Sequence, residues 1–171
     1  MLLNVNDVVV YAREGLCVIT EISEQEIGDE RKEYYKLRHI FDGGATIFIP
    51  VSNELLTSKI RPVLSLNEIH EIIRKMPAAE PIRLEAYSDT TRKAEYKELL
   101  SNGNIDDVVK LIKTLYMRHR TREHEGKSVF ASDKKFMKHA EKLLYEEFAY
   151  VLGIEPDQVV PYITEQIANP A

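Results

Sequence analysis

The run Asp7-Val8-Val9-Val10-Tyr11, then Gly15, then Leu16-Cys17-Val18-Ile19-Thr20-Glu21-Ile22, decides the fold of the first part of the chain. Its β-branched and aromatic residues favour two strands on either side of a glycine break. Two further strand-like runs, residues 32–38 and 45–51, flank the turn Asp42-Gly43-Gly44, and residues 60–63 can add a short fifth strand. Because these connections leave no room for crossover helices, the pattern predicts a small antiparallel barrel.

After Pro62 the apolar residues recur with a helical period. Ser65-Leu66-Asn67-Glu68 is a capping box, which predicts a helix that ends near Met76-Pro77 and leads into a linker over residues 77–86. Later helices are expected from residue 88 or 89 to 100, from 104 to about 122, from Ser132 to 153, and from 156 onwards, with a loop over 123–131. The chain is therefore expected to be α+β, with a barrel domain over 1–62 and a compact all-α domain of about five helices over 63–171.

Composition excludes several classes of protein. The chain has 171 residues, a net charge of −5 and one cysteine, Cys17, so an internal disulfide and a cysteine-based zinc site are excluded. Cys17 lies among apolar strand residues, which favours a buried structural role over a nucleophilic one. Apolar runs are too short to span a membrane and the N-terminus lacks the basic start of a secretory signal, so a cytoplasmic protein is expected.

Signals for catalysis are weak. The sequence holds neither a G-x-S-x-G element nor a phosphate-binding P-loop. His119 and His124 are five residues apart and do not share a helical face, so a solvated charged turn is favoured over a metal site. We expect no enzyme, no catalytic residues, no cofactor and no metal; a metal hydrolase built on these two histidines is an alternative that metal analysis would test.

Basic charge is concentrated in one part of the chain. Residues 90–144 carry thirteen basic and eight acidic side chains, whereas residues 145–171 carry five acidic and no basic ones. A local basic field of this kind suits a phosphate-bearing partner, although solvated helix faces would give the same pattern. With no aromatic platform of the single-strand type, duplex contact is favoured over base stacking.

The order and spacing of several motifs resemble the CarD/CdnL-type bacterial transcription regulators, whose N-terminal module is similar to the polymerase-interacting domain of the transcription-repair coupling factor. In the first part these motifs are Asn6-Asp7-Val8-Val9-Val10-Tyr11, Gly15, Lys32-Glu33-Tyr34-Tyr35-Lys36-Leu37, Ile47-Phe48-Ile49-Pro50 and Ile60-Arg61-Pro62-Val63. In the second part they are Lys93-Ala94 through Leu99 to Gly103-Asn104, Val108-Val109-Lys110-Leu111-Ile112, and Ser132-Asp133-Lys134-Lys135 with Ala140 and Leu143-Leu144. The resemblance covers nearly the whole chain.

The resemblance implies an SH3-like or Tudor-like barrel that binds the β subunit of bacterial RNA polymerase, and a helical domain that contacts upstream promoter duplex at the fork and stabilises the open complex. It implies polymerase contacts by Tyr11, Arg13, Phe48, Ile49 and Pro50. We expect Arg92 and Lys93 to contact DNA because they open the helix where the family's DNA contacts begin, with Tyr87 near the fork. The other expected phosphate contacts lie off the apolar stripes of their helices: Lys110, Lys113, Lys134 and Lys138. A monomer or a weak homodimer is expected, without a membrane partner.

The chain also departs from the family pattern. The family's Y-P-x-H-G becomes Tyr11-Ala12-Arg13-Glu14-Gly15, and the arginines that better-known members use against polymerase fall near Gln25 and Phe48. The chain has no tryptophan, so Tyr87 either replaces the family's ring at the fork or packs on its own domain. The net charge and the missing tryptophan keep a second hypothesis open, namely a protein-only interaction module or stress adaptor that binds no DNA.

Overall fold

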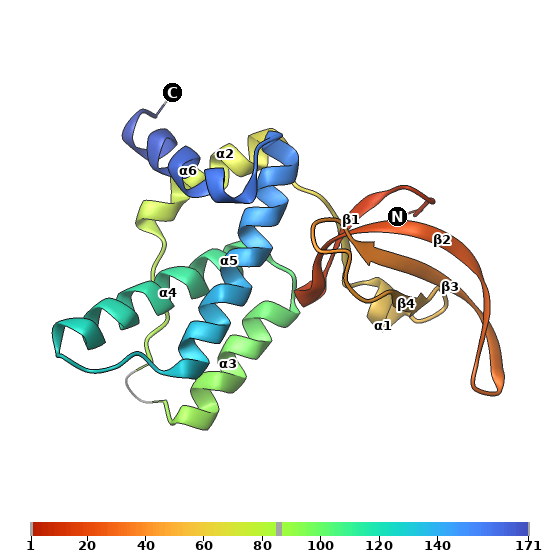
Figure 1. Cartoon of the computed structure of the whole chain (residues 1–171), viewed down its shortest axis with the longest axis horizontal. Coiled ribbons are helices and arrows are strands. Elements are labelled where there is room, and N and C mark those ends of the chain that lie inside the picture. Colours follow the sequence, from red (N-terminus) through yellow and green to blue (C-terminus); the bar gives the residue numbers. More distant parts are fainter. Residues whose placement is uncertain (1, 85–86, 171) are drawn as a thin grey trace. The chain divides into compact units, whose positions relative to one another are not determined.

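The structure of the chain is a computed structural model that describes residues 2–84 and 87–170 (Figure 1). It divides into two units, Met1–Val63 and Leu64–Ala171, each with its own apolar core. Residues 85 and 86 of the predicted linker lie outside the described residues. None of the helices in the described part combines the length and the apolar character needed to cross a membrane.

The N-terminal unit is a five-stranded antiparallel sheet with the strand order β4-β3-β2-β1-β5, and the five predicted strands are confirmed. A short helix, α1, joins the last two strands. The elements are β1 Val8–Tyr11, the 3₁₀ turn η1 Ala12–Glu14, β2 Gly15–Ile27, β3 Glu30–His39, β4 Ile47–Pro50, α1 Glu54–Thr57 and β5 Ile60–Pro62. β4 and β5 are therefore the two edges of the sheet.

Alternating side chains along these strands build one buried face. Val9 pairs with Cys17 and both are buried, as is Leu37, which pairs with Ile19. The buried position predicted for Cys17 is confirmed, because its side chain has no exposed surface. β2 and β3 continue further than the sequence pattern indicated, and they turn at Gly28, whose positive φ of 68° suits a residue without Cβ.

The turn after β1 holds an unusual backbone conformation at Ala12. This residue has φ of 40°, in the left-handed region that costs an L-residue about 1–2 kcal/mol. Its amide donates to the carbonyl of Lys59 across 3.1 Å, which ties the turn to the chain entering β5. The family pattern has proline here. Proline cannot adopt this φ, and it has no amide hydrogen to donate to the Lys59 carbonyl.

The second unit is helical, as predicted. Its elements are α2 Leu66–Lys75, the 3₁₀ turn η2 Met76–Ala78, α3 Asp89–Ser101, α4 Ile105–His124, α5 Ala131–Leu152, the 3₁₀ turn η3 Pro156–Gln158 and α6 Val159–Ala168. The capping box of Ser65 and Glu68 is present, and Ser88 and Asn104 cap α3 and α4 as expected. Two expectations were wrong: α4 continues to His124, and α5 begins at Ala131, so that Ser132 lies inside the helix and Phe130 is its N-cap residue.

α4 and α5 pack along each other and form most of the helical core. Leu111 and Leu115 of α4 and Ala140 and Phe148 of α5 are fully buried in it. α3 adds Tyr96, whose ring packs edge-on against Phe136 of α5. The first half of α5 therefore packs against α3, and its C-terminal end leads into η3 and α6. α6 in turn contacts α2.

Candidate functional site

The predicted polymerase-contacting residues lie on two separate parts of the N-terminal sheet. Phe48 and Pro50 belong to the edge strand β4, whereas Tyr11 ends β1 and Arg13 lies in the exposed part of η1. β3 and β2 lie between those two strands, so the structure does not bring the two groups onto one strand.

Within β4, neighbouring side chains face opposite sides of the sheet. Phe48 is 40% exposed and its ring meets that of Tyr34 edge-on, with 6.3 Å between the ring centroids. Ile49 is 1% exposed and lies in the core, so its side chain is removed from the contact set. The strand thus offers one aromatic side chain and a sheet edge that ends at Pro50.

Three of the predicted DNA-contacting lysines are exposed on the helical unit: Lys110, Lys134 and Lys138. Lys138 borders a groove of about 620 Å³ along α5, here called the α5 groove, together with Ser132, Lys135, Phe136, His139 and Lys142. Lys110 borders a different hollow, beside α2 and η2. The predicted lysines are therefore distributed over more than one surface.

Other predicted contacts are already engaged by protein groups. Lys113 donates to the carbonyls of Met76 and Pro77, at 3.3 and 2.9 Å, and so caps the end of α2 and η2. Lys93 pairs with Asp89 at 2.8 Å. Arg92 is 5% exposed and is bonded to Asp89, so its expected role as an exposed phosphate contact is corrected to a buried structural one.

Arg92 belongs to a group that we call the arginine cluster, made of Arg92, Arg118, Arg122, Phe130 and Asp133. The three guanidinium carbons lie 5.3, 5.2 and 4.0 Å from the centroid of the Phe130 ring. Asp133 has no exposed surface; its carboxylate accepts from Nε of Arg118 at 2.7 Å and lies 3.6 Å from Nε of Arg92. The cluster joins α3, α4 and the start of α5.

Tyr96 lies beside this cluster, and the cluster's charges act on the pKa of its phenol. Burial raises the pKa of the Tyr96 phenol to about 12, and the charge of Asp133 acts in the same direction, while Arg118 and Arg92 oppose it. The phenol therefore stays neutral at every ordinary pH.

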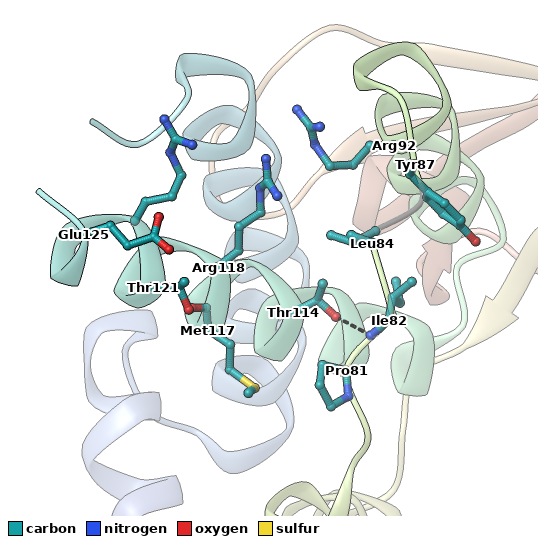
Figure 2. A pocket seen from close by; sticks show the side chains of 11 residues that line it. Pro81, Ile82, Leu84, Tyr87, Arg92, Thr114, Met117, Arg118, Thr121 and Glu125 are labelled. Atoms are coloured by element: carbon teal, nitrogen blue, oxygen red, sulfur yellow. Dashed lines mark hydrogen bonds between the residues drawn. The ribbon is translucent and has the colours of Figure 1, made fainter. Parts of the chain in front are cut away.

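The chain leading to Tyr87 is held against α4. The amide of Ile82 donates to Oγ1 of Thr114 at 2.9 Å, as the dashed line in Figure 2 shows, and the amide of Tyr87 donates to the carbonyl of Leu84. Tyr87 is 37% exposed and lines a pocket of about 470 Å³ with Arg92, Arg118 and Arg122. Its contact with a fork stays a prediction.

Sequence reasoning missed the arginine cluster as a site. The spacing of Arg118 and Arg122 was visible as an i, i+4 pair, but Phe130 follows a loop and Arg92 comes from another helix, so no local pattern joins them. For the histidines, no group of three or more His, Cys, Asp and Glu side chains in residues 2–84 and 87–170 is arranged to hold a metal ion.

Known families match both units. The CarD-like/TRCF RID domain matches residues 3–64, and the CarD C-terminal domain matches residues 65–164. A protein of Bacillus subtilis (strain 168) named "Putative transcription factor YdeB" is 28% identical over 158 residues, which cover 91% of this chain and 95% of that protein. The two matches meet where the structure separates its sheet unit from its helical unit, and the chain belongs to the CarD-like family of transcription factors, a family without enzymatic activity.

Proposed function

We propose that this protein binds the β subunit of bacterial RNA polymerase through the β4 edge of its sheet, and that its helical unit contacts upstream promoter DNA and stabilises the open complex. The observation that carries the proposal is the match of residues 3–64 to a polymerase-interacting domain, on a sheet with an accessible edge strand. It has no catalytic step: its effect on transcription is the binding free energy that it adds to the open complex.

The β4 edge suits strand addition. An extended partner segment that pairs with an edge strand gains main-chain hydrogen bonds, and alternate side chains supply specificity. Phe48 is the large apolar side chain that β4 presents outwards, supported by the ring of Tyr34 from β3. Pro50 is compatible with this edge because proline cannot donate to a ladder and is tolerated only at such positions.

Co-migration on a sizing column with core polymerase and with the isolated β subunit tests the first half. Phe48→Ala should weaken both complexes, whereas Ile27→Ala, which removes a 49% exposed apolar side chain at the far end of the β2–β3 hairpin, should leave them unchanged. No co-migration of the unaltered chain with either preparation would overturn the proposal.

The DNA half rests on exposed lysines. Lys134 and Lys138 are one turn apart on α5 and both are exposed, and the α5 groove adds Lys135 and Lys142 nearby. Each phosphate contact that is lost should flatten the plot of log affinity against log salt by about 0.9. Lys134→Gln with Lys138→Gln should therefore reduce the salt slope for fork-junction promoter DNA by about two, and Lys32→Gln on the sheet unit should not change it.

A protein-only interaction module is the second candidate. Protein groups already engage Arg92, Lys93 and Lys113, which lowers the number of cations available to phosphates. Titration of the full chain with fork-junction DNA at two salt concentrations separates the candidates. Polymerase binding without any salt-sensitive DNA binding would favour the protein-only module and exclude the DNA half of the first proposal.

A further inference from the structure

The arginine cluster holds more positive charge than its buried carboxylate can balance. Asp133 supplies one negative charge to Arg118 and Arg92, and Arg92 also pairs with Asp89. Arg122 donates through Nε to the carbonyl of Ser128 at 2.7 Å. Within the described part of the chain, no carboxylate lies within 4.0 Å of the Arg122 guanidinium.

Among the described residues, two arginines of the cluster, Arg118 and Arg122, have terminal nitrogens that no protein acceptor engages. Each of the two uses Nε for a protein hydrogen bond. The bond to Asp133 and the face of Phe130 fix the plane of Arg118, while Ser128 and the same ring fix that of Arg122. Fixed guanidinium planes are the arrangement that binds a tetrahedral oxyanion through paired hydrogen bonds.

These arginines line the pocket of Figure 2, which has a volume of about 470 Å³. Its other walls include the apolar side chains of Ile82, Leu84 and Met117. Arg92 also lines it; its side chain is 7% exposed, and its Nε makes no hydrogen bond among the described residues and lies 3.6 Å from Oδ1 of Asp133. Among the described residues that line the pocket, Glu125 is the acidic one, and Lys127 pairs with it at 3.1 Å.

We propose that this pocket binds a phosphate group through the terminal nitrogens of Arg118 and Arg122. The inference rests on the proposed function in one respect, because nucleic-acid backbone is the expected source of the phosphate. A free phosphorylated molecule presents the same chemistry, and the experiment below distinguishes the two sources.

The first arm measures binding of the full chain to fork-junction DNA. Arg122→Gln should weaken binding about tenfold, the value expected for one charge-assisted hydrogen bond, and reduce the salt slope by about 0.9. Arg120→Gln is the matched control, because Arg120 lies on the same helix, carries the same charge and contacts Tyr116 outside the pocket. It should weaken binding less than twofold. Arg122 is chosen over Arg118 because loss of Arg118 would leave Asp133 buried without its hydrogen-bonded partner.

The second arm titrates the full chain with tripolyphosphate and follows the Nε–H resonances of Arg118 and Arg122 by NMR. Saturable shifts that Arg122→Gln removes and Arg120→Gln retains support the site, with a free phosphorylated ligand as its source if the DNA arm shows no difference.

Three results separate failure of the site from failure of the proposed function. Equal weakening of DNA binding by the two variants, together with no saturable shift, would overturn the site and leave the DNA half of the function intact. If the unaltered chain binds no DNA, the DNA half fails, and the phosphate titration alone decides the site. Absence of both effects overturns the site.

Discussion

Replacing Asp133 by asparagine tests whether the arginine cluster holds the helical unit together. The substitution keeps the size of the side chain and one acceptor oxygen. It removes the negative charge of the cluster's carboxylate, which has no exposed surface. It weakens the 2.7 Å bond from Arg118 and leaves Arg92, at 5% exposed, short of negative charge. Removing one partner of a buried ion pair costs about 3–5 kcal/mol. Because the Arg118 side chain is 24% exposed, solvent compensates part of the loss, and we expect about 3 kcal/mol.

Urea unfolding followed by circular dichroism at 222 nm is the suitable assay, since α2–α6 supply nearly all of the helical signal. With a slope of about 2 kcal/mol per molar urea, the midpoint should fall by about 1.5 M. Asp157→Asn, at an exposed position in η3, is the control and should shift the unfolding free energy by less than about 0.5 kcal/mol. A change of that small size for Asp133→Asn would refute the reasoning, because the buried carboxylate would then contribute no more than a surface one.

Three other predictions concern single side chains. Ala12→Pro should destabilise the sheet unit by about 3 kcal/mol or more in thermal unfolding, because proline cannot adopt φ of 40° and loses the bond to the Lys59 carbonyl; Ala12→Gly should not destabilise it. Tyr96 has a pKa of about 12 in the folded chain and about 10 in the unfolded chain, so the stabilisation that comes from its neutral phenol is complete below pH 10. Between pH 10 and 12 the free energy of unfolding should fall by about 1.4 kcal/mol per pH unit, and Tyr96→Phe should reduce this slope in urea titrations. Phe48→Ala should lower the unfolding free energy by less than about 1.5 kcal/mol because the ring is 40% exposed, and a larger loss would show that Phe48 is a core residue.

Local signals in the sequence predicted local structure well. Ser65, Ser88 and Asn104 each precede their helices and accept from the first turn, because a cap depends only on residues two or three positions away. Ser132 has the same chemistry but lies one residue inside α5. Phe130 takes the N-cap position instead, where its ring packs among arginines that a local pattern cannot reveal.

On α4, the i, i+3, i+4, i+7 spacing of the sequence predicts an apolar stripe, and the buried side of the helix differs from it. The predicted stripe consists of Ile105, Val108, Val109, Ile112, Leu115 and Tyr116. Ile105, Val108 and Leu115 are buried as expected, but Leu111 was left out of the stripe and has no exposed surface, whereas Tyr116 was included and is 51% exposed. α4 packs against both α3 and α5, so its buried arc is set by two neighbours and not by one regular face.

The candidate site was the least predictable part of the molecule. Arg92 was expected to contact DNA because it opens the helix after the linker, where the DNA contacts of the resembled family begin. It is buried because Asp133, more than forty residues later in the chain, lies 3.6 Å away in the fold. Pairing with a carboxylate that is distant in the sequence decides which cationic side chains remain available to a partner. Such pairs are visible only in the folded structure.

The four residues of β4 also bear on solubility. A long exposed edge would template the pairing of one copy with another and lead to aggregation. Here the strand is about 13 Å long and closes with a residue that has no amide hydrogen, so a ladder started by a second copy stops after a few bonds. In the proposed complex, the same short length would limit a polymerase segment to a similarly short pairing, and selectivity would then come from the ring of Phe48. An edge of this length is open enough for one partner and too short to seed a fibril.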